Sequence, residues 1–110
     1  MIDWDRVAEL REEVGAEDFD EVVTLFLEEV QEVAGRLTRA PDPARLEADL
    51  HFVKGSAYNL GFERLGAMCT AGERLAAAGR AGEVDVEAIL DCHLQSRAAF
   101  LGGMCNLARG

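Results

Sequence analysis

Apolar residues recur at intervals of three and four along most of the chain, a spacing that predicts amphipathic helices. The clearest run consists of Phe19, Val23, Phe26, Val30, Val33 and Leu37. A second run consists of Leu46, Leu50, Val53, Ala57 and Leu60. No stretch of any length alternates between apolar and polar residues as a half-buried strand would, so the sequence predicts an all-α fold.

Residues with strong preferences for helix ends set the boundaries of the first two predicted helices. Asp3 and Gly15 bound a short first helix, because aspartate caps helix N-termini and glycine often ends a helix. Asp18 and Glu21 have the spacing of a capping box. The second helix is therefore expected to begin near Asp18 and to continue through the first apolar run.

The later helices are marked in the same way. The third is expected to begin at Asp42 and to end at Gly61, the fourth to lie within residues 62–80, and the last within residues 85–101. The end of the last helix stays open, because Gly102 and Gly103 lie within what would be its continuation. The connections are short, which favours antiparallel neighbours. We therefore predict that residues 1–110 form one domain, an antiparallel four-helix bundle with an additional short N-terminal helix.

Charge narrows the classes of partner. The chain has 21 acidic and 11 basic residues and a net charge of −10, which repels nucleic acid and anionic membrane surfaces. The acidic start does not resemble a signal peptide, and no apolar run approaches the roughly 20 residues that span a bilayer. We expect a cytoplasmic protein without nucleic-acid or membrane partners. A monomer is the default expectation for one domain with a charged surface.

Cysteine and histidine spacing argues against a metal site. The three cysteines, Cys69, Cys92 and Cys105, have unrelated spacings that fit reduced thiols better than disulfides. Cys92 and His93 are adjacent, so on a helix they diverge by about 100° and cannot easily share an ion. We expect no metal ligands, and we interpret His93 as structural because it borders the apolar face of the last helix.

His51 is the candidate for chemistry. It lies more than about 90° from the centre of its helix's apolar stripe and therefore faces outward. Gly55 is one turn further along the same face, and a glycine inside a helix costs about 1 kcal/mol relative to alanine. Steric clearance over the imidazole is a physical motive for that cost. A neutral imidazole nitrogen is a nucleophile that could accept a phosphoryl group. Lys54, three residues on, could then neutralise part of the charge of that group.

Neighbouring positions supply candidates for orientation and docking. If the third and fourth helices fold back about Gly61, Glu73 lies level with His51. It could accept the imidazole N–H or pair with Lys54, although a plain surface glutamate is an equally good interpretation. Around His51 a possible docking surface consists of Ala44, Ala48, Phe52 and Tyr58. Phe52 has the alternative of packing under the N-terminal helix.

The segment "HFVKGSAYNLGFERLGAMC" resembles the phosphorylation-site helix of histidine-containing phosphotransfer (HPt) domains. The matching elements are His51, Lys54, Gly55, Ser56, Ala57, Leu60, Gly61, Leu65 and Cys69. Residues 2–29 also look like the lead-in of bacterial members, and we expect a free-standing shuttle. Two positions depart from the common pattern. Glu73 stands where many members have glutamine, and Gly72 replaces a larger apolar residue, which would bring the helices closer or leave a gap.

The resemblance implies a phosphoryl carrier rather than an enzyme. It implies that His51 accepts a phosphoryl group from an aspartate of a receiver domain, or from a kinase, and passes it to a response regulator. No cofactor of its own is expected, because Mg²⁺ and the catalytic pocket belong to the partner receiver. The alternative is a phosphorylation-independent adaptor that binds and sequesters receiver domains.

Overall fold

The computed structural model of the protein describes the backbone of residues 2–39 and 42–109, with the side chains of these residues as far as 104. The helices are α1 (Trp4–Val14), α2 (Ala16–Arg39), α3 (Pro43–Asn59), α4 (Glu63–Ala77) and α5 (Val86–Arg109), and a short 3₁₀ turn, η1 (Ala81–Glu83), precedes α5. Within the described ranges the only β-type pairing is an isolated bridge between Ile2 and Phe62. The predicted all-α fold is confirmed.

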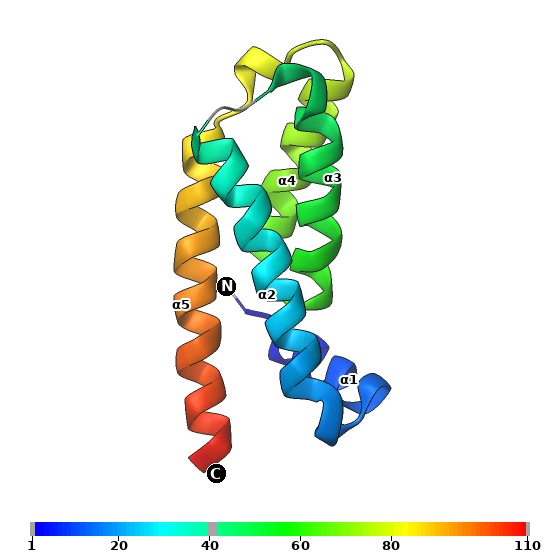
Figure 1. Ribbon diagram of the computed structural model, residues 1–110, viewed down its shortest axis with the longest axis vertical. Coiled ribbons are helices and arrows are strands. Elements are labelled where there is room, and N and C mark those ends of the chain that lie inside the picture. Colours follow the sequence, from blue (N-terminus) through cyan, green and yellow to red (C-terminus); the bar gives the residue numbers. More distant parts are fainter. Residues whose placement is uncertain (1, 40–41, 110) are drawn as a thin grey trace.

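The four long helices lie side by side, and consecutive ones run in opposite directions (Figure 1). Helices α3 and α4 share the most extensive contact, while α5 lies against α4 and α2. Because α3 and α5 are not neighbours, they occupy opposite corners of this arrangement. An outward side chain on α3 and one on α5 therefore face different sides of the molecule.

Helix α1 contacts α2 and α3 near the turn that ends α3. The backbone N–H of Asp3 donates to the carbonyl of Gly61 at 2.7 Å, and Arg6 donates to the Asn59 side chain at 3.1 Å. Gly61 has φ +77°, and a Cβ there would lie 2.5 Å from the Asp3 carbonyl oxygen. Only glycine fits this position, so Gly61 both ends α3 and accepts the N-terminal segment.

The predicted caps at the starts of α1 and α3 are confirmed. Asp3 accepts a hydrogen bond from the backbone N–H of Arg6 at 3.2 Å, and Asp42 accepts one from Ala44 at 2.9 Å. Such a cap contributes about 1 kcal/mol by satisfying an N–H that has no partner within the helix.

One predicted boundary is wrong, and one that the sequence left open is now defined. Helix α2 begins at Ala16, not near Asp18, because the carbonyl of Gly15 already accepts the Asp18 N–H at 3.2 Å. Helix α5 continues beyond residue 101 to Arg109. A Cβ at position 103 would overlap the indole ring of Trp4, so this position within the helix requires a glycine. The glycine that made the helix end uncertain in the sequence therefore makes room for a side chain of α1.

The core follows the predicted apolar stripes. Leu46, Leu50, Val53 and Ala57 of α3 are buried, as are five of the six residues predicted for α2, Phe26 being partly exposed. Burying a leucine, valine or phenylalanine side chain contributes about 1.5–3 kcal/mol to stability. The fully buried large residues are Phe62, Phe100, Leu50, Leu60, Leu65 and Val30. None of the described helices is long and apolar enough to cross a membrane.

Candidate functional site

His51 projects from the outer face of α3. Its side chain is 68% exposed, whereas its neighbours Leu50 and Val53 are buried in the core. Leu50 and Val53 anchor α3 in the core and so hold the water-exposed imidazole on a rigid support. An exposed histidine on a rigid helix can be reached by another protein without local unfolding.

Glu73 of α4 connects His51 to Lys54. Its Oε1 lies 2.8 Å from Nδ1 of His51, and its Oε2 lies 2.8 Å from Nζ of Lys54. The sequence analysis treated these two contacts as alternatives, whereas the structure contains both. The carboxylate therefore bridges two residues of α3 that are three positions apart.

The ionisation of Glu73 determines which way its hydrogen bond to the histidine runs. The hydrogen bond from Lys54, and then the one from His51, holds the pKa of Glu73 below its ordinary value. An ionised carboxylate can only accept hydrogen bonds, so Nδ1 of His51 carries the proton and donates. In the neutral ring the lone pair then lies on Nε2, which is the nitrogen turned away from Glu73.

Small residues leave the space around the imidazole open. A Cβ added at Gly55 would have nothing within 4 Å. Ala44 and Ala48, on the turns that precede His51, are exposed. The surface directly over the ring is therefore low and accessible to a partner.

Two aromatic side chains flank this low surface. Phe52 is 41% exposed and Tyr58 is 45% exposed, so neither belongs to the core. Tyr58 lies across Gly66 of α4, where a Cβ would approach its ring to 2.6 Å. Its hydroxyl is within 3.5 Å of the Thr70 hydroxyl. The tyrosine is thus supported by α4, while part of its ring remains available for contact.

Leu25 of α2 is a further exposed apolar residue that the sequence analysis did not single out. It is 52% exposed. It precedes Arg36 by three helical turns and so shares its face, and Arg36 donates to Asp49 of α3 at 3.0 Å. Leu25 therefore lies on the side of α2 that faces α3. Its position outside the apolar stripe of α2 was the available signal.

The surroundings of Gly72 show whether its missing side chain leaves a gap between α3 and α4. A Cβ at this position would lie 2.9 Å from Leu50 Cδ1 and 3.2 Å from Val84 Cγ1. The missing side chain therefore leaves no gap; it allows α3 and α4 to approach closely. Leu50 and Gly72 immediately precede His51 and Glu73, so this close approach occurs at the level of the site.

The second histidine is buried. His93 is 3% exposed, and its Nε2 lies 3.3 Å from Oε1 of Gln31 on α2. Its Nδ1 has no partner among the described residues. Burial, and secondarily the nearby Arg97, lowers the pKa of His93. This environment holds a neutral imidazole inside the protein and gives a reaction partner no access.

Cysteines and carboxylates do not converge on a metal site in the described residues. Cys69 and Cys92 are free and buried, and burial raises the pKa of the Cys69 thiol to about 12. A thiol with so high a pKa is a poor nucleophile at neutral pH. The side chain of Cys105 lies outside the described residues.

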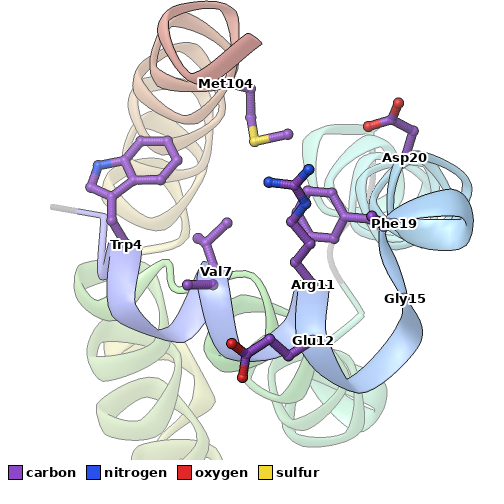
Figure 2. A pocket seen from close by; sticks show the side chains of 10 residues that line it. Trp4, Val7, Arg11, Glu12, Gly15, Phe19, Asp20 and Met104 are labelled. Carbon is purple, nitrogen blue, oxygen red and sulfur yellow. The ribbon is translucent and has the colours of Figure 1, made fainter. Parts of the chain in front are cut away.

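An open groove of about 750 Å³ lies between α1, the start of α2 and the end of α5 (Figure 2). Trp4, Val7, Phe19 and Met104 provide apolar lining, and Arg11 is among the polar residues beside them. None of the lining residues belongs to α3 or α4, so the groove is separate from His51. It has no cluster of candidate catalytic groups.

Comparison with known proteins identifies the class to which this fold and site belong. The family model described as "Hpt domain" matches residues 21–100, which is most of the chain. The chain therefore belongs to the Hpt domain family. No curated protein and no solved structure gave a match. Hpt domains are phosphotransfer carriers that interact with receiver domains in two-component signalling. The matched region contains His51, Lys54, Gly55 and Glu73.

Proposed function

We propose that this protein is the histidine phosphotransfer component of a multistep phosphorelay. His51 accepts a phosphoryl group from a receiver-domain aspartate or a kinase and passes it to a response regulator. The observation that supports this most directly is the 68% exposed imidazole whose Nδ1 is bonded to Glu73, which leaves Nε2 directed away from the protein. Nε2 is thus the nitrogen that forms the bond to phosphorus.

The roles of the surrounding residues follow from their positions. Gly55 provides clearance, because a partner must bring an acyl phosphate to within bonding distance of the ring. The docking surface consists of Ala44, Ala48, Phe52 and Tyr58, and we add Leu25 to it. Exposed aromatic residues beside a reactive group are suitable anchors for a partner. Lys54 is expected to offset phosphate charge, and its Nζ also contacts Oε2 of Glu73.

The carrier needs no cofactor of its own in this proposal. Mg²⁺ is expected on the partner receiver domain, where it would offset charge on the phosphoryl group during transfer. We also propose that the protein acts as a cytoplasmic monomer, with receiver domains of response regulators and hybrid kinases as partners. The many exposed carboxylates of α2, among them Glu21, Glu28 and Glu32, favour partners with basic rims around their docking face.

Phosphoryl transfer from a phosphorylated receiver domain tests the proposal. Label on the protein that is acid-labile, alkali-stable and absent from the His51→Gln variant is the expected result. A folded protein that binds receivers but takes no label from several of them would contradict the proposal. That outcome would favour the adaptor, in which docking alone sequesters the receiver.

A further inference from the structure

The groove between α1, the start of α2 and the end of α5 has the size of a site for a small organic molecule. Its volume is about 750 Å³. Ligand pockets in proteins usually measure roughly 300–1,000 Å³. Val7 of α1 and Phe19 of α2 line the groove and are each only 4% exposed, so they also belong to the core. Core packing therefore supports the apolar floor of the groove.

Trp4 forms one wall of the groove, and α5 holds its ring in place. The indole stacks on the buried ring of Phe100, with a centroid distance of 5.8 Å and an interplanar angle of 7°. The absence of a side chain at Gly103 makes room for it. The Trp4 side chain nevertheless remains 37% exposed. A bound molecule can thus cover the rest of the indole without any rearrangement of the helices.

Arg11 brings a positive charge to one end of this apolar lining. Trp4, Ala8 and Arg11 lie on one face of α1, because they are spaced by four and three residues. In Figure 2 the Arg11 guanidinium points from α1 towards α5, between Phe19 and Met104. The groove face of α1 therefore consists of an apolar stretch that ends at a cation.

The charge of Arg11 is not neutralised by a neighbouring carboxylate. Arg6, on the same helix, pairs with Glu13 at 3.0 Å, whereas no carboxylate of the described residues forms an ion pair with Arg11. Glu12 and Asp20 also line the groove. In Figure 2, however, the Glu12 carboxylate points away from the Arg11 guanidinium, and that of Asp20 lies beyond Phe19. The guanidinium is therefore available to an anion that enters the groove.

We propose that this groove binds a small amphiphilic carboxylate, with its apolar chain along Trp4 and Val7 and its head group at Arg11. A guanidinium matches the two oxygens of a carboxylate and can donate to both. Seven residues of helix separate Trp4 from Arg11, or about 10 Å. With carbon–carbon bonds of about 1.5 Å, an extended chain of roughly eight carbons spans that distance. The proposal does not depend on the carrier role, because no lining residue belongs to α3.

The first test compares three probes that share an eight-carbon chain and differ in the charge of the head group: octanoate, 1-octanol and octylammonium. Trp4 is the only tryptophan of the chain, so its fluorescence reports directly on the groove. We expect a saturable blue shift with octanoate at concentrations roughly tenfold lower than with the other two probes. The net charge of −10 favours the cation at the surface in general, so a preference for octanoate has to come from a local positive group. Tightest binding of octylammonium, or no saturable change with octanoate, would overturn the proposal.

The second test removes the cation. Arg11→Gln should weaken octanoate binding by roughly tenfold, as expected for the loss of a hydrogen bond between charged groups, and should leave the binding of 1-octanol within about twofold of the wild type. Arg74→Gln is the matched control, because Arg74 is an exposed arginine of α4 and lies outside the groove. It should bind octanoate as the wild type does. Equal losses in the two variants would mean that only the total charge matters, and the assignment of the head group to Arg11 would be wrong.

The third test locates the apolar chain. Ala8 is an exposed residue of the lining, so Ala8→Leu fills the groove without disturbing the core. It should keep the helicity of the wild type and weaken the binding of both octanoate and 1-octanol by at least about tenfold. In ¹H–¹⁵N NMR spectra of the wild type, octanoate should shift the amide signals of α1, the start of α2 and the end of α5. Shifts centred on Phe52 and Tyr58 instead, or wild-type binding by Ala8→Leu, would show that the chain binds elsewhere and would overturn the proposal.

Discussion

The two histidines of this protein lie in opposite environments. His51 is on the outer face of α3, largely exposed, with a carboxylate on Nδ1 and open space over Gly55. His93 is inside the molecule between α2 and α5, with an amide on Nε2 and no described partner for Nδ1. The same side chain is thus prepared for contact with a partner in one place and used as a core residue in the other. What differs is access and the charge of the hydrogen-bond partner.

Substituting each histidine in turn provides the strongest test of this contrast. His51→Gln should abolish labelling by a phosphorylated receiver and leave the melting temperature nearly unchanged, because the side chain is mostly in water. His93→Gln should keep the label and lower the melting temperature, because it disturbs a buried contact with Gln31. Labelling assays and thermal melts on both variants measure this. Label retained in His51→Gln would remove His51 from the mechanism.

The open space over His51 is tested by filling it. Gly55→Arg should fold, since arginine is a better helix residue than glycine. It should slow transfer from a receiver by roughly a hundredfold, equivalent to about 2.7 kcal/mol of transition-state binding. Ala98→Arg, on an exposed position of α5, is the matched control, because α5 occupies the corner opposite α3. If both variants transfer at the wild-type rate, docking does not use the surface over Gly55.

The open surface over His51 also differs from the tight contact between α3 and α4 beneath it. Gly55 lies in the open surface and Gly72 in the tight contact. Gly55→Ala should stabilise the protein by about 0.5–1 kcal/mol, because the new methyl group meets nothing and alanine is the better helix former. Gly72→Ala gains the same helix propensity, but its methyl group would press on Leu50 and Val84. We therefore expect it to be less favourable than Gly55→Ala by about 1–3 kcal/mol. Urea denaturation measures both free energies of unfolding. Equal effects of the two substitutions would contradict the close approach of α3 and α4.

Most of the helical architecture could be predicted from local signals. The apolar stripes and the caps at Asp3 and Asp42 are properties of short segments, and the structure bears them out. The start of α2 was mispredicted although a local backbone contact at Gly15 decides it. The end of α5 could not be predicted because a distant contact decides it. The continuation of α5 through Gly103 depends on Trp4, which is about a hundred residues earlier in the chain. No local pattern contains that information.

The candidate site shows the same limit. The outward position of His51 and the level of Glu73 followed from helical geometry and the turn at Gly61. The division of the two Glu73 oxygens between His51 and Lys54 did not, because it depends on side-chain torsions and on the spacing that Gly72 allows. From the sequence, Gly72 could either bring α3 and α4 closer or leave a gap between them, and only the position of Leu50 decides between the two.

The buried histidine should make stability depend on pH in a predictable direction. The pKa of His93 is lower in the folded protein than its ordinary value of about 6.5 in an unfolded chain, mainly because burial disfavours the charged ring. The unfolded chain therefore binds the proton more readily. The contribution of His93 to stability is complete above pH of about 6.5 and is lost as the pH falls through the lower pKa of the folded state.

Thermal melts of the wild type and of His93→Gln between pH 8 and 5 measure this contribution. The wild type should lose more stability over that range than the variant does, because glutamine does not titrate. The groups that act on the ring are Gln31 from α2 and Arg97 from its own helix, and the positive charge of Arg97 further disfavours a second cation beside it. Parallel pH profiles in the two proteins would mean that His93 gains its proton without cost. In that case burial would not be what separates it from His51.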